Sequence, residues 1–263
     1  MSGPPAPSGP PVLLLTCEHA GRLVPPEHAT LFRGREALLA SHRGWDPGAM
    51  EVAEVLARRL RRWRSGPVLA HPWTRLLADV NRSPDHPRVF AEGVQALPAQ
   101  ERAEVLATYH RPHREAVRAA VAKEVAAGRG VVQVGVHTFT PVLDGRPRTT
   151  DIGILYDPAR SPERSLADAW CRGLRAALPE RRIHRNRPYR GTSDGLTTWL
   201  RASFAPAAYL GLELEVNTRL LDPAAYGGGQ ELVALAGTLA DALGGWASLP
   251  HPPDSSPRGF QPA

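Results

Sequence analysis

Two histidines follow short apolar runs that are typical of buried strands. The run from Val12 to Thr16 ends just before His19, and the run from Val131 to Val136 ends at His137. Runs of this length suit a buried strand and are too short for a helix. Because open α/β sheets carry their chemistry beyond the carboxyl ends of their strands, we expect the two imidazoles to lie at the same edge of one sheet.

A third run, YLGLELEVN, carries two carboxylates at its end. Glu213 and Glu215 are two residues apart, so on a strand both side chains face the same side. A carboxylate beside a metal-bound water is the usual general base for hydrolysis. The alternative, a solvated edge strand, is disfavoured by the apolar residues around the pair. We therefore expect the three strand ends to converge on one metal ion.

Two neutral imidazoles and one carboxylate form a zinc ligand set that leaves a position for water. Asp46 could supply the carboxylate, but an Asp directly before a proline is also a good helix N-cap, and both interpretations stay open. Glu18 could replace Asp46. However, adjacent side chains on an extended segment point to opposite faces, so Glu18 is not expected to face the site if His19 does. Each histidine alone could instead be a hydrogen-bonded core residue, because no HExxH motif is present.

Other polar residues could bind a substrate. Asn81 and Arg82 follow a predicted strand and offer an amide and a guanidinium fork, which suit a carboxylate. A surface turn is the alternative for this pair. Arg148, in a loop over residues 138–150 that is long enough to cover a substrate, and Tyr189 are further candidates for the same pocket.

The sequence also permits a competing enzyme chemistry. Cys17 could act as a nucleophile if a histidine such as His110 or His113 approached it, although a small residue at a strand end is more simply a buried hydrophobe. His110 and His113 are three residues apart on a predicted helix and share a face. They could be metal ligands, substrate contacts or solvated, and we interpret them as part of the helix or as supporting groups for the site.

The composition indicates a globular enzyme of 263 residues. Its hydrophobic content of 42% suits one large core, and no apolar run approaches the roughly 20 residues that cross a bilayer. The segment MSGPPAPSGPP lacks a signal-peptide pattern, which predicts a cytoplasmic location. The net charge of +6 comes almost entirely from scattered arginines, and no nucleic-acid-binding motif is present. Two cysteines are too few for a disulfide framework.

Strands alternate with helices, which predicts a single three-layer α/β/α domain with a mixed, mostly parallel sheet. We expect this domain to span residues 12–247, between disordered tails at 1–11 and 248–263. Expected strands cover 12–16, 68–70, 76–80, 131–136, 151–157, 182–189 and the YLGLELEVN run. The first expected helix runs from the GWDPG segment to about 63, and the next helical pattern runs from about 98 to 127, with a kink or a division into two helices around YHRPHR because of Pro112. Further expected helices run from 161 to about 178 with a cap at Ser161, from the 191–194 turn to about 204, and from about 230 to 243.

Seven segments taken in order resemble the N-formylglutamate amidohydrolase family: CEHAG, GWDPG, DVNR, YHRPHR, VHTFTP with DGRPRTTDIGILYD, NRPYRGTSDG and GLELEVN. The resemblance covers roughly residues 12–245. More distantly, the chain resembles zinc carboxypeptidases and aspartoacylase-type deacylases. That resemblance implies a phosphorylase/hydrolase-like fold with a zinc ion held by two histidines and an acid.

The resemblance also implies roles for individual residues. His19 and His137 would be the two histidine ligands. Asn81 and Arg82 would be the pair that binds a substrate carboxylate, and Glu215 would be the catalytic glutamate. The carboxypeptidase pattern has its acidic ligand three residues after the first histidine, where this chain has Arg22. Asp46 is therefore our choice for the acid.

The activity implied is zinc-dependent hydrolysis of the amide bond in an N-formyl or other N-acyl amino acid. The expected partner is this small molecule, without nucleic acid or membrane, and the oligomeric state is left open. Two alternatives remain at this stage. One is a metal-free, carboxylate-binding or degenerate member of the same fold, and the other is a basic nucleic-acid-associated protein.

Overall fold

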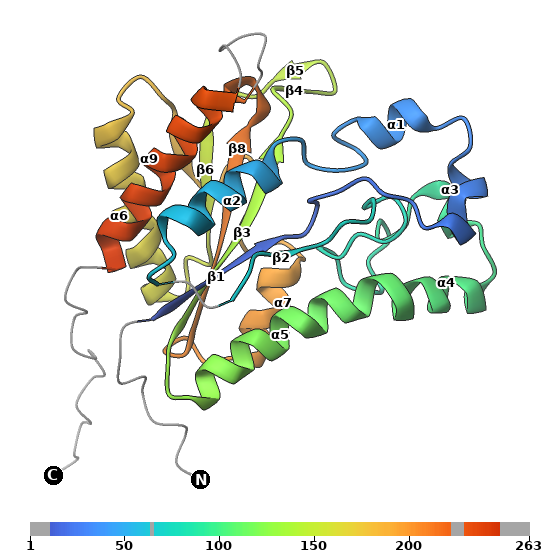
Figure 1. Cartoon of the computed structure of the whole chain (residues 1–263), viewed down its shortest axis with the longest axis horizontal. Helices are drawn as coiled ribbons and strands as arrows, with labels where there is room; N and C mark the ends of the chain where they lie inside the picture. The colour runs from blue at the N-terminus through green and yellow to red at the C-terminus, as the bar shows by residue number, and fades with distance from the viewer. Residues whose placement is uncertain (1–10, 64–65, 222–228, 248–263) are drawn as a thin grey trace, which may run out of the picture.

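The computed structural model describes residues 11–63, 66–221 and 229–247, and in these residues the centre is a mixed six-stranded sheet in the order β2-β1-β3-β8-β6-β7 (Figure 1). β2, β1, β3 and β8 run parallel, whereas β6 runs antiparallel to β8 and parallel to β7. Apart from Pro11, the predicted tails lie outside the described residues. The strands are β1 (Val12–Cys17), β2 (Leu69–Ala70), β3 (Val131–Phe139), β6 (Ile152–Leu155), β7 (Ile183–Arg185) and β8 (Tyr209–Asn217).

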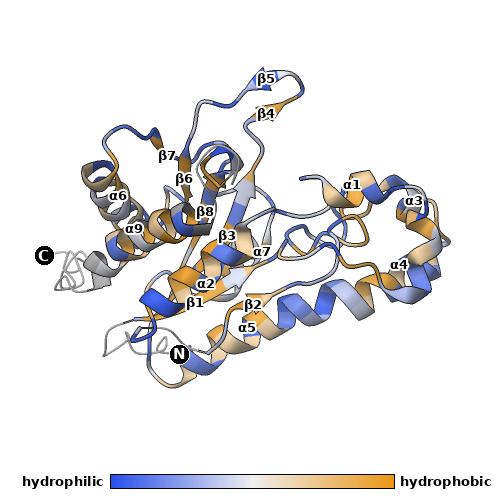
Figure 2. Cartoon of the chain, turned by 45° about the horizontal axis from the view of Figure 1, so that its top comes forward, coloured by the Kyte–Doolittle hydropathy of each residue, from blue (hydrophilic) through white to orange (hydrophobic). Residues whose placement is uncertain are grey.

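Helices cover both faces of the sheet, which confirms the predicted three layers. The strands are apolar on both sides because both faces are covered. In Figure 2, hydrophilic and hydrophobic stretches alternate along α5, as expected of a helix with one face on the core. No helix in the described ranges is long and apolar enough to cross a membrane. One face carries α2 (Ala49–Arg59), α6 (Ser161–Ala177) and α9 (Gly229–Ala247), and the other carries α5 (Arg111–Ala126) and α7 (Leu196–Ser203).

A second core lies beyond the end of the sheet, on the right of Figure 1. It includes α1 (Glu36–Ala40), α3 (Glu92–Gln95) and α4 (Ala99–Val105). The expected strand over residues 76–80 is wrong, because this segment forms turns. Its residues Leu76 and Leu77 pack in the second core with Val94 and Tyr109. The apolar run that suggested a strand thus belongs to a folded loop.

Several element boundaries differ from the expected ones. The helix from GWDPG begins at Ala49 and ends at Arg59, short of residue 63. Ser161 is the first residue of α6 rather than its cap, and no side-chain cap bond is made there. The expected interruption near Pro112 is confirmed, because a π-helical segment, Leu106–His110, separates α4 from α5.

The loops at the carboxyl edge also differ in detail. β3 continues to Phe139, so His137 lies inside the strand rather than beyond it. The predicted flap over residues 138–150 contains a short antiparallel hairpin of β4 (Val142–Leu143) and β5 (Arg146–Pro147). β8 is an interior strand between β3 and β6, so the edge-strand alternative for Glu213 and Glu215 is wrong.

A fully buried carboxylate connects β8 with the helices around it. Glu163 of α6 accepts hydrogen bonds from the Gly211 N–H at 3.0 Å, from the Asp157 N–H at 2.9 Å and from Arg201 Nε at 3.1 Å. The Arg201 side chain is only 7% exposed. Removing one partner of such a pair leaves the other charge buried without compensation.

We therefore expect Glu163→Ala to lower the free energy of unfolding by about 3 kcal/mol or more. Glu115→Ala is the matched control, because Glu115 forms a half-exposed pair with Arg118 and its loss should cost at most about 1 kcal/mol. Urea denaturation of both variants measures the difference. Equal losses of unfolding free energy in the two variants would show that the buried Glu163 stabilises the fold no more than a surface ion pair does.

Candidate active site

Three predicted residues meet at the carboxyl edge of the sheet. His19 lies in the turn after β1, and His137 lies near the end of the neighbouring strand β3. Asp46 comes from the loop before α2, where its N–H donates to the His19 carbonyl at 3.0 Å. His137 pairs with Glu215 across β3 and β8. The predicted convergence of the three strand ends is therefore present.

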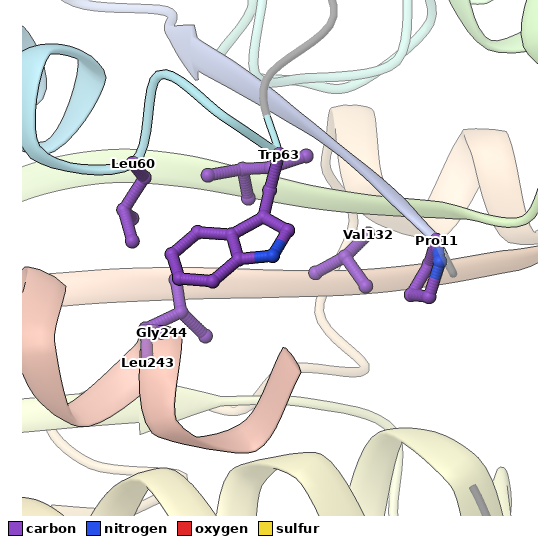
Figure 3. Close-up of a pocket in the computed structure, with 7 residues that line it drawn as sticks. Pro11, Leu60, Trp63, Val132, Leu243 and Gly244 are labelled. Atoms are coloured by element: carbon purple, nitrogen blue, oxygen red, sulfur yellow. The ribbon is translucent and has the colours of Figure 1, made fainter. Parts of the chain in front are cut away.

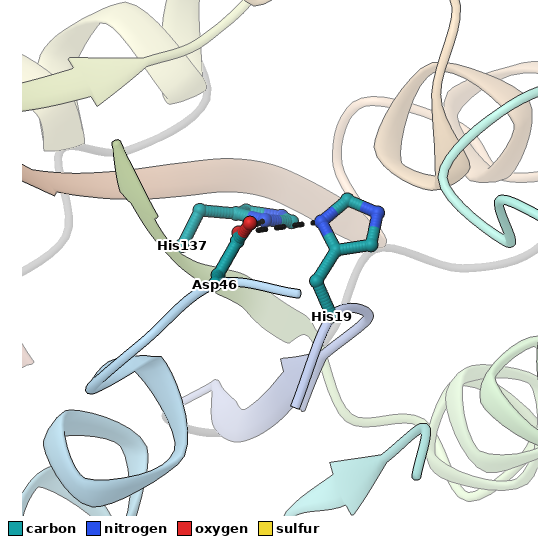
Figure 4. A group of neighbouring side chains, drawn as sticks. All are labelled: His19, Asp46 and His137. Carbon is teal, nitrogen blue, oxygen red and sulfur yellow. Dashed lines mark hydrogen bonds and ion pairs between the residues drawn. The ribbon is translucent and has the colours of Figure 1, made fainter. Parts of the chain in front are cut away.

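One oxygen of Asp46 lies between the two imidazoles (Figure 4). Asp46 Oδ2 is 3.2 Å from His19 Nδ1 and 3.0 Å from His137 Nδ1. The three ligand-type atoms lie within 4.8 Å of one another, and all three residues are buried. Their number and type fit a zinc ion with a position left open. The capping interpretation of Asp46 is wrong, because the N-cap of α2 is Gly48 and no side chain caps it.

A carboxylate faces the outer nitrogen of each imidazole. His19 Nε2 is 2.7 Å from Asp79 Oδ1, and His137 Nε2 is 3.1 Å from Glu18 Oε2. Metal-binding histidines usually donate their second ring N–H to such a group, which fixes the ring and leaves the other nitrogen bare. The expectation that Glu18 faces away from the site is wrong. Glu18 and His19 lie in a turn beyond β1, where strand alternation no longer applies.

Arg75 compensates two of the buried carboxylates. Its Nη1 donates to Asp46 Oδ1 at 3.1 Å, and its Nη2 donates to Asp79 Oδ2 at 3.0 Å. Burial alone would raise both carboxyl pKa values. Arg75 and His19 nevertheless hold the pKa of Asp79 well below its usual range, and His19 and His137 do the same for the pKa of Asp46. Sequence analysis missed Arg75 and Asp79, although an acid inside the apolar run LLADV is a signal, because it needs a partner.

Glu215 is a buried carboxyl group beside the cluster. Burial is the main cause that raises its pKa to about 8; His137 opposes the shift, and the charges of Asp46 and Glu213 add to it. Its Oε2 has no hydrogen-bond partner among the described residues. A carboxyl group that titrates near neutrality and has an unpaired oxygen can exchange protons with a ligand. Glu213, two residues earlier on β8, is half-buried.

Asn81 and Arg82 lie next to Asp79, and their side chains have different surroundings. Asn81 Oδ1 accepts from the Leu196 N–H at 2.7 Å, so this oxygen supports the start of α7. Arg82 Nη1 donates to the Asp194 carbonyl at 3.2 Å, and its Nε is 4.0 Å from Asp79 Oδ2. The Arg82 side chain is 26% exposed. A guanidinium with solvent access therefore lies at the rim of the cluster.

Arg148 and Tyr189 also lie together, as the prediction of a shared pocket requires. The Arg148 guanidinium is 4.8 Å from the ring centre of Tyr189 and 4.7 Å from that of Phe139. The positive charge of Arg148 opposes the rise in the pKa of Glu215, so the stacked side chains of Arg148 and Tyr189 lie near Glu215. A hollow of about 520 Å³ adjoins Arg148 and the β4–β5 hairpin. That this segment covers a substrate stays a prediction.

His110 and His113 contact different groups, and neither is a member of the buried cluster. His110 Nε2 is 2.8 Å from the carbonyl oxygen of Arg82 and supports that turn. His113 packs against His71, with ring centres 5.1 Å apart. Burial lowers the pKa of His71 to about 3 and also lowers the pKa of His113, which favours the neutral form of both imidazoles. Sequence analysis missed His71, which follows β2 and shares the carboxyl edge of the sheet.

The competing nucleophile is excluded by its surroundings. Cys17 is fully buried, and burial, with the charges of Glu18 and Asp46, raises its pKa well above the usual value. Such a thiol is unreactive, because the thiolate is the nucleophile. The carboxypeptidase pattern has an acid at the position of Arg22. In this chain the guanidinium carbon of Arg22 lies 5.5 Å from the ring centre of Trp45.

A separate cavity has no chemistry of its own (Figure 3). It measures about 20 Å³ and is lined by apolar residues that include Leu60, Trp63 and Val132. This volume is too small for a substrate, and the lining is almost entirely apolar. The strand-end cluster is therefore the candidate active site.

A model of the N-formylglutamate amidohydrolase family matches residues 11–221. Among solved structures, gene product Atu2144 from Agrobacterium tumefaciens is 33% identical over 89% of each chain, with a TM-score of 0.72. N-formylglutamate amidohydrolase from Ralstonia eutropha JMP134 is 18% identical over 92% of this chain and 95% of that one, and its TM-score of 0.66 shows the same fold. A metallo-carboxypeptidase from Burkholderia cenocepacia reaches a TM-score of only 0.40. No curated protein matches the chain.

The family model covers most of the chain, including every residue of the buried cluster and Glu215. The resemblance drawn from the seven sequence segments is thereby confirmed. This chain belongs to the N-formylglutamate amidohydrolase family.

Proposed function

We propose that this protein is a zinc-dependent hydrolase that cleaves the amide bond of an N-formyl or other N-acyl amino acid, with N-formylglutamate-like molecules as first candidates. The observation that carries the proposal is the meeting of two imidazole Nδ1 atoms with one Asp46 oxygen, within 4.8 Å, beside the raised-pKa carboxyl of Glu215. Family membership supports amide hydrolysis.

His19, Asp46 and His137 would hold the zinc ion or another divalent metal. The fit rests on the outer ring nitrogens: since each faces a carboxylate, each Nδ1 can present a lone pair to a cation. When bound, such an ion polarises an acyl carbonyl and makes a water molecule more acidic. Residues of this chain supply the remaining steps.

Glu215 moves the proton. As a carboxylate it accepts a proton from the water that attacks the acyl carbon, and it donates that proton to the nitrogen as the C–N bond breaks. The products are a carboxylic acid and a free amine. The charge of Asp46 contributes to the raised pKa of Glu215. A cation held by Asp46 would favour the ionised form of Glu215, which is the form that accepts a proton.

Arg82 would bind the carboxylate of the amino-acid half. Its guanidinium offers a bidentate fork at the rim of the cluster, and Asn81 can add its amide N–H groups, since only its oxygen is used by α7. Arg148 and Tyr189 would contact the substrate from the flap side. Arg75 is already paired with Asp46 and Asp79, so it organises the cluster rather than the substrate.

A hydrolysis screen tests the proposal. N-formyl, N-acetyl and N-succinyl amino acids are each assayed with and without a chelator, and N-formyl amino acid amides serve as matched substrates without the carboxylate. We expect hydrolysis of at least one N-acyl amino acid, loss of the activity with chelator, its return with zinc, and weak turnover of the amides. If no substrate is turned over, or if the chelator has no effect, the proposal is contradicted.

Substitution of the proton carrier provides a second test. Glu215→Gln keeps the shape of the side chain but cannot accept a proton, so hydrolysis should fall by a factor of about a hundred or more while zinc is retained. Glu213→Gln, two residues away on the same strand face, is the matched control and should keep most of the activity. A fully active Glu215→Gln variant would show that another group moves the proton.

A further inference from the structure

A turn over residues 79–83 carries Asn81 and Arg82, the two residues that would bind the substrate carboxylate. The turn contacts both α5 and the start of α7 through hydrogen bonds. Arg82 has a long side chain with many rotamers, and fixing such a side chain opposes binding. The groups that hold this turn before a substrate arrives therefore influence how well Arg82 can bind one.

Arg114 of α5 holds the backbone of this turn. Its Nη1 donates to the carbonyl oxygens of Val80 at 2.9 Å and of Arg82 at 3.0 Å. The Arg82 carbonyl also accepts from His110 Nε2 at 2.8 Å, and the Arg82 N–H donates to the Asp79 carbonyl at 3.0 Å. Both polar groups of the Arg82 backbone are thus fixed by hydrogen bonds.

The burial of Arg114 comes at a cost in stability. Arg114 is only 4% exposed, and among the described residues no ion pair includes it. Its guanidinium carbon lies 4.7 Å from the ring centre of Trp199 in α7. A buried guanidinium without a carboxylate in contact is unfavourable, and an apolar residue at this position would avoid that penalty. The two hydrogen bonds to the 79–83 turn are what only a donor at position 114 can supply.

Asp194 holds the turn from the side of α7. Its carboxylate accepts from the Ser83 N–H at 2.8 Å and from the Ser83 hydroxyl. Its carbonyl accepts from Arg82 Nη1 at 3.2 Å. A guanidinium has five N–H donors, so this one bond orients the fork and leaves donors for an anion. The side chain of Arg82 is therefore oriented by the same residue that fixes Ser83.

Gly195 allows the start of α7 to come this near to the turn. A Cβ atom at position 195 would lie 2.9 Å from Asn81 Oδ1, which is too close for two atoms that are not bonded. The same Asn81 oxygen accepts from the Leu196 N–H at 2.7 Å. The 79–83 turn is thus held between α5 and the segment that begins α7.

We propose that Arg114 and Asp194 are positioning residues for substrate binding, which hold the 79–83 turn so that the Arg82 guanidinium is oriented for a carboxylate before the substrate arrives. This inference rests on the proposed function, in which Arg82 binds the carboxylate of the amino-acid half. It adds two residues that act through Arg82. A side chain that is oriented in advance loses less conformational freedom on binding, which lowers KM and leaves the chemical step unchanged.

Steady-state kinetics of the whole chain test the inference. The substrates are an N-acyl amino acid that the chain hydrolyses and the amide of the same compound, which lacks the carboxylate. Arg114→Met removes both hydrogen bonds to the turn and keeps a long side chain. We expect KM for the acid to rise about tenfold, with kcat within about twofold of the wild type. For the amide, kcat/KM should stay within about twofold, because the amide has no carboxylate for Arg82 to bind.

The effect should disappear when Arg82 is absent. Arg82→Met should itself raise KM for the acid, and adding Arg114→Met should raise it further by less than about twofold, because the two residues act as one unit. Asp194→Asn keeps the shape of the side chain but has one acceptor fewer for Ser83. It is the second variant if Arg114→Met does not fold, with the same difference between acid and amide expected.

Arg118→Met is the matched control. Arg118 lies four residues further along α5, is half-exposed and pairs with Glu115, so its loss should leave the kinetics of both substrates unchanged. Equal losses on acid and amide in Arg114→Met, an unchanged KM for the acid in Arg114→Met and Asp194→Asn, or a full further loss in the Arg82→Met background would overturn the inference. An Arg82→Met variant with the wild-type KM for the acid would instead contradict the proposed role of Arg82, and with it the inference.

Discussion

The placement of one buried carboxylate, that of Asp46, determines how the site is built. Its Oδ2 faces both imidazoles and its Oδ1 faces Arg75. A buried carboxylate is stable only where its charge is compensated and its oxygens are hydrogen-bonded. The compensating groups come from the turn after β1, from β3 and from the segment that follows β2, so these elements must meet at the edge of the sheet. The parallel arrangement of β2, β1 and β3 brings them there.

The same cluster concentrates negative charge in a place that excludes water. Glu18, Asp46 and Asp79 are all buried beside it, with Arg75 as the guanidinium that pairs with two of them. A divalent cation between the imidazoles would compensate this charge and fix both rings. The supporting carboxylates would then direct both Nδ1 atoms to the ion. The ligand candidates, the supporting acids and Arg75 thus form one unit.

Sequence reasoning found the parts of this unit that lie at strand ends. His19 and His137 follow apolar runs, and strand ends of a parallel sheet share an edge. Asp46 could be named only as one of two alternatives, because an Asp before a proline at a helix start also fits a cap. Asp79 was missed, since residues 71–82 have no regular period and fold through contacts with the second core. For the same reason the strand expected over 76–80 was wrong: its apolar residues pack against distant helices and do not pair with a neighbouring strand.

The most direct test of this account is the metal content of the chain, purified without a histidine tag and compared with its Asp46→Ala variant. The account predicts one equivalent of tightly bound zinc per wild-type chain and little or none in the variant, with both proteins folded by circular dichroism. Absence of a bound metal from the wild-type chain after incubation with zinc, or equal binding by the two proteins, would contradict it.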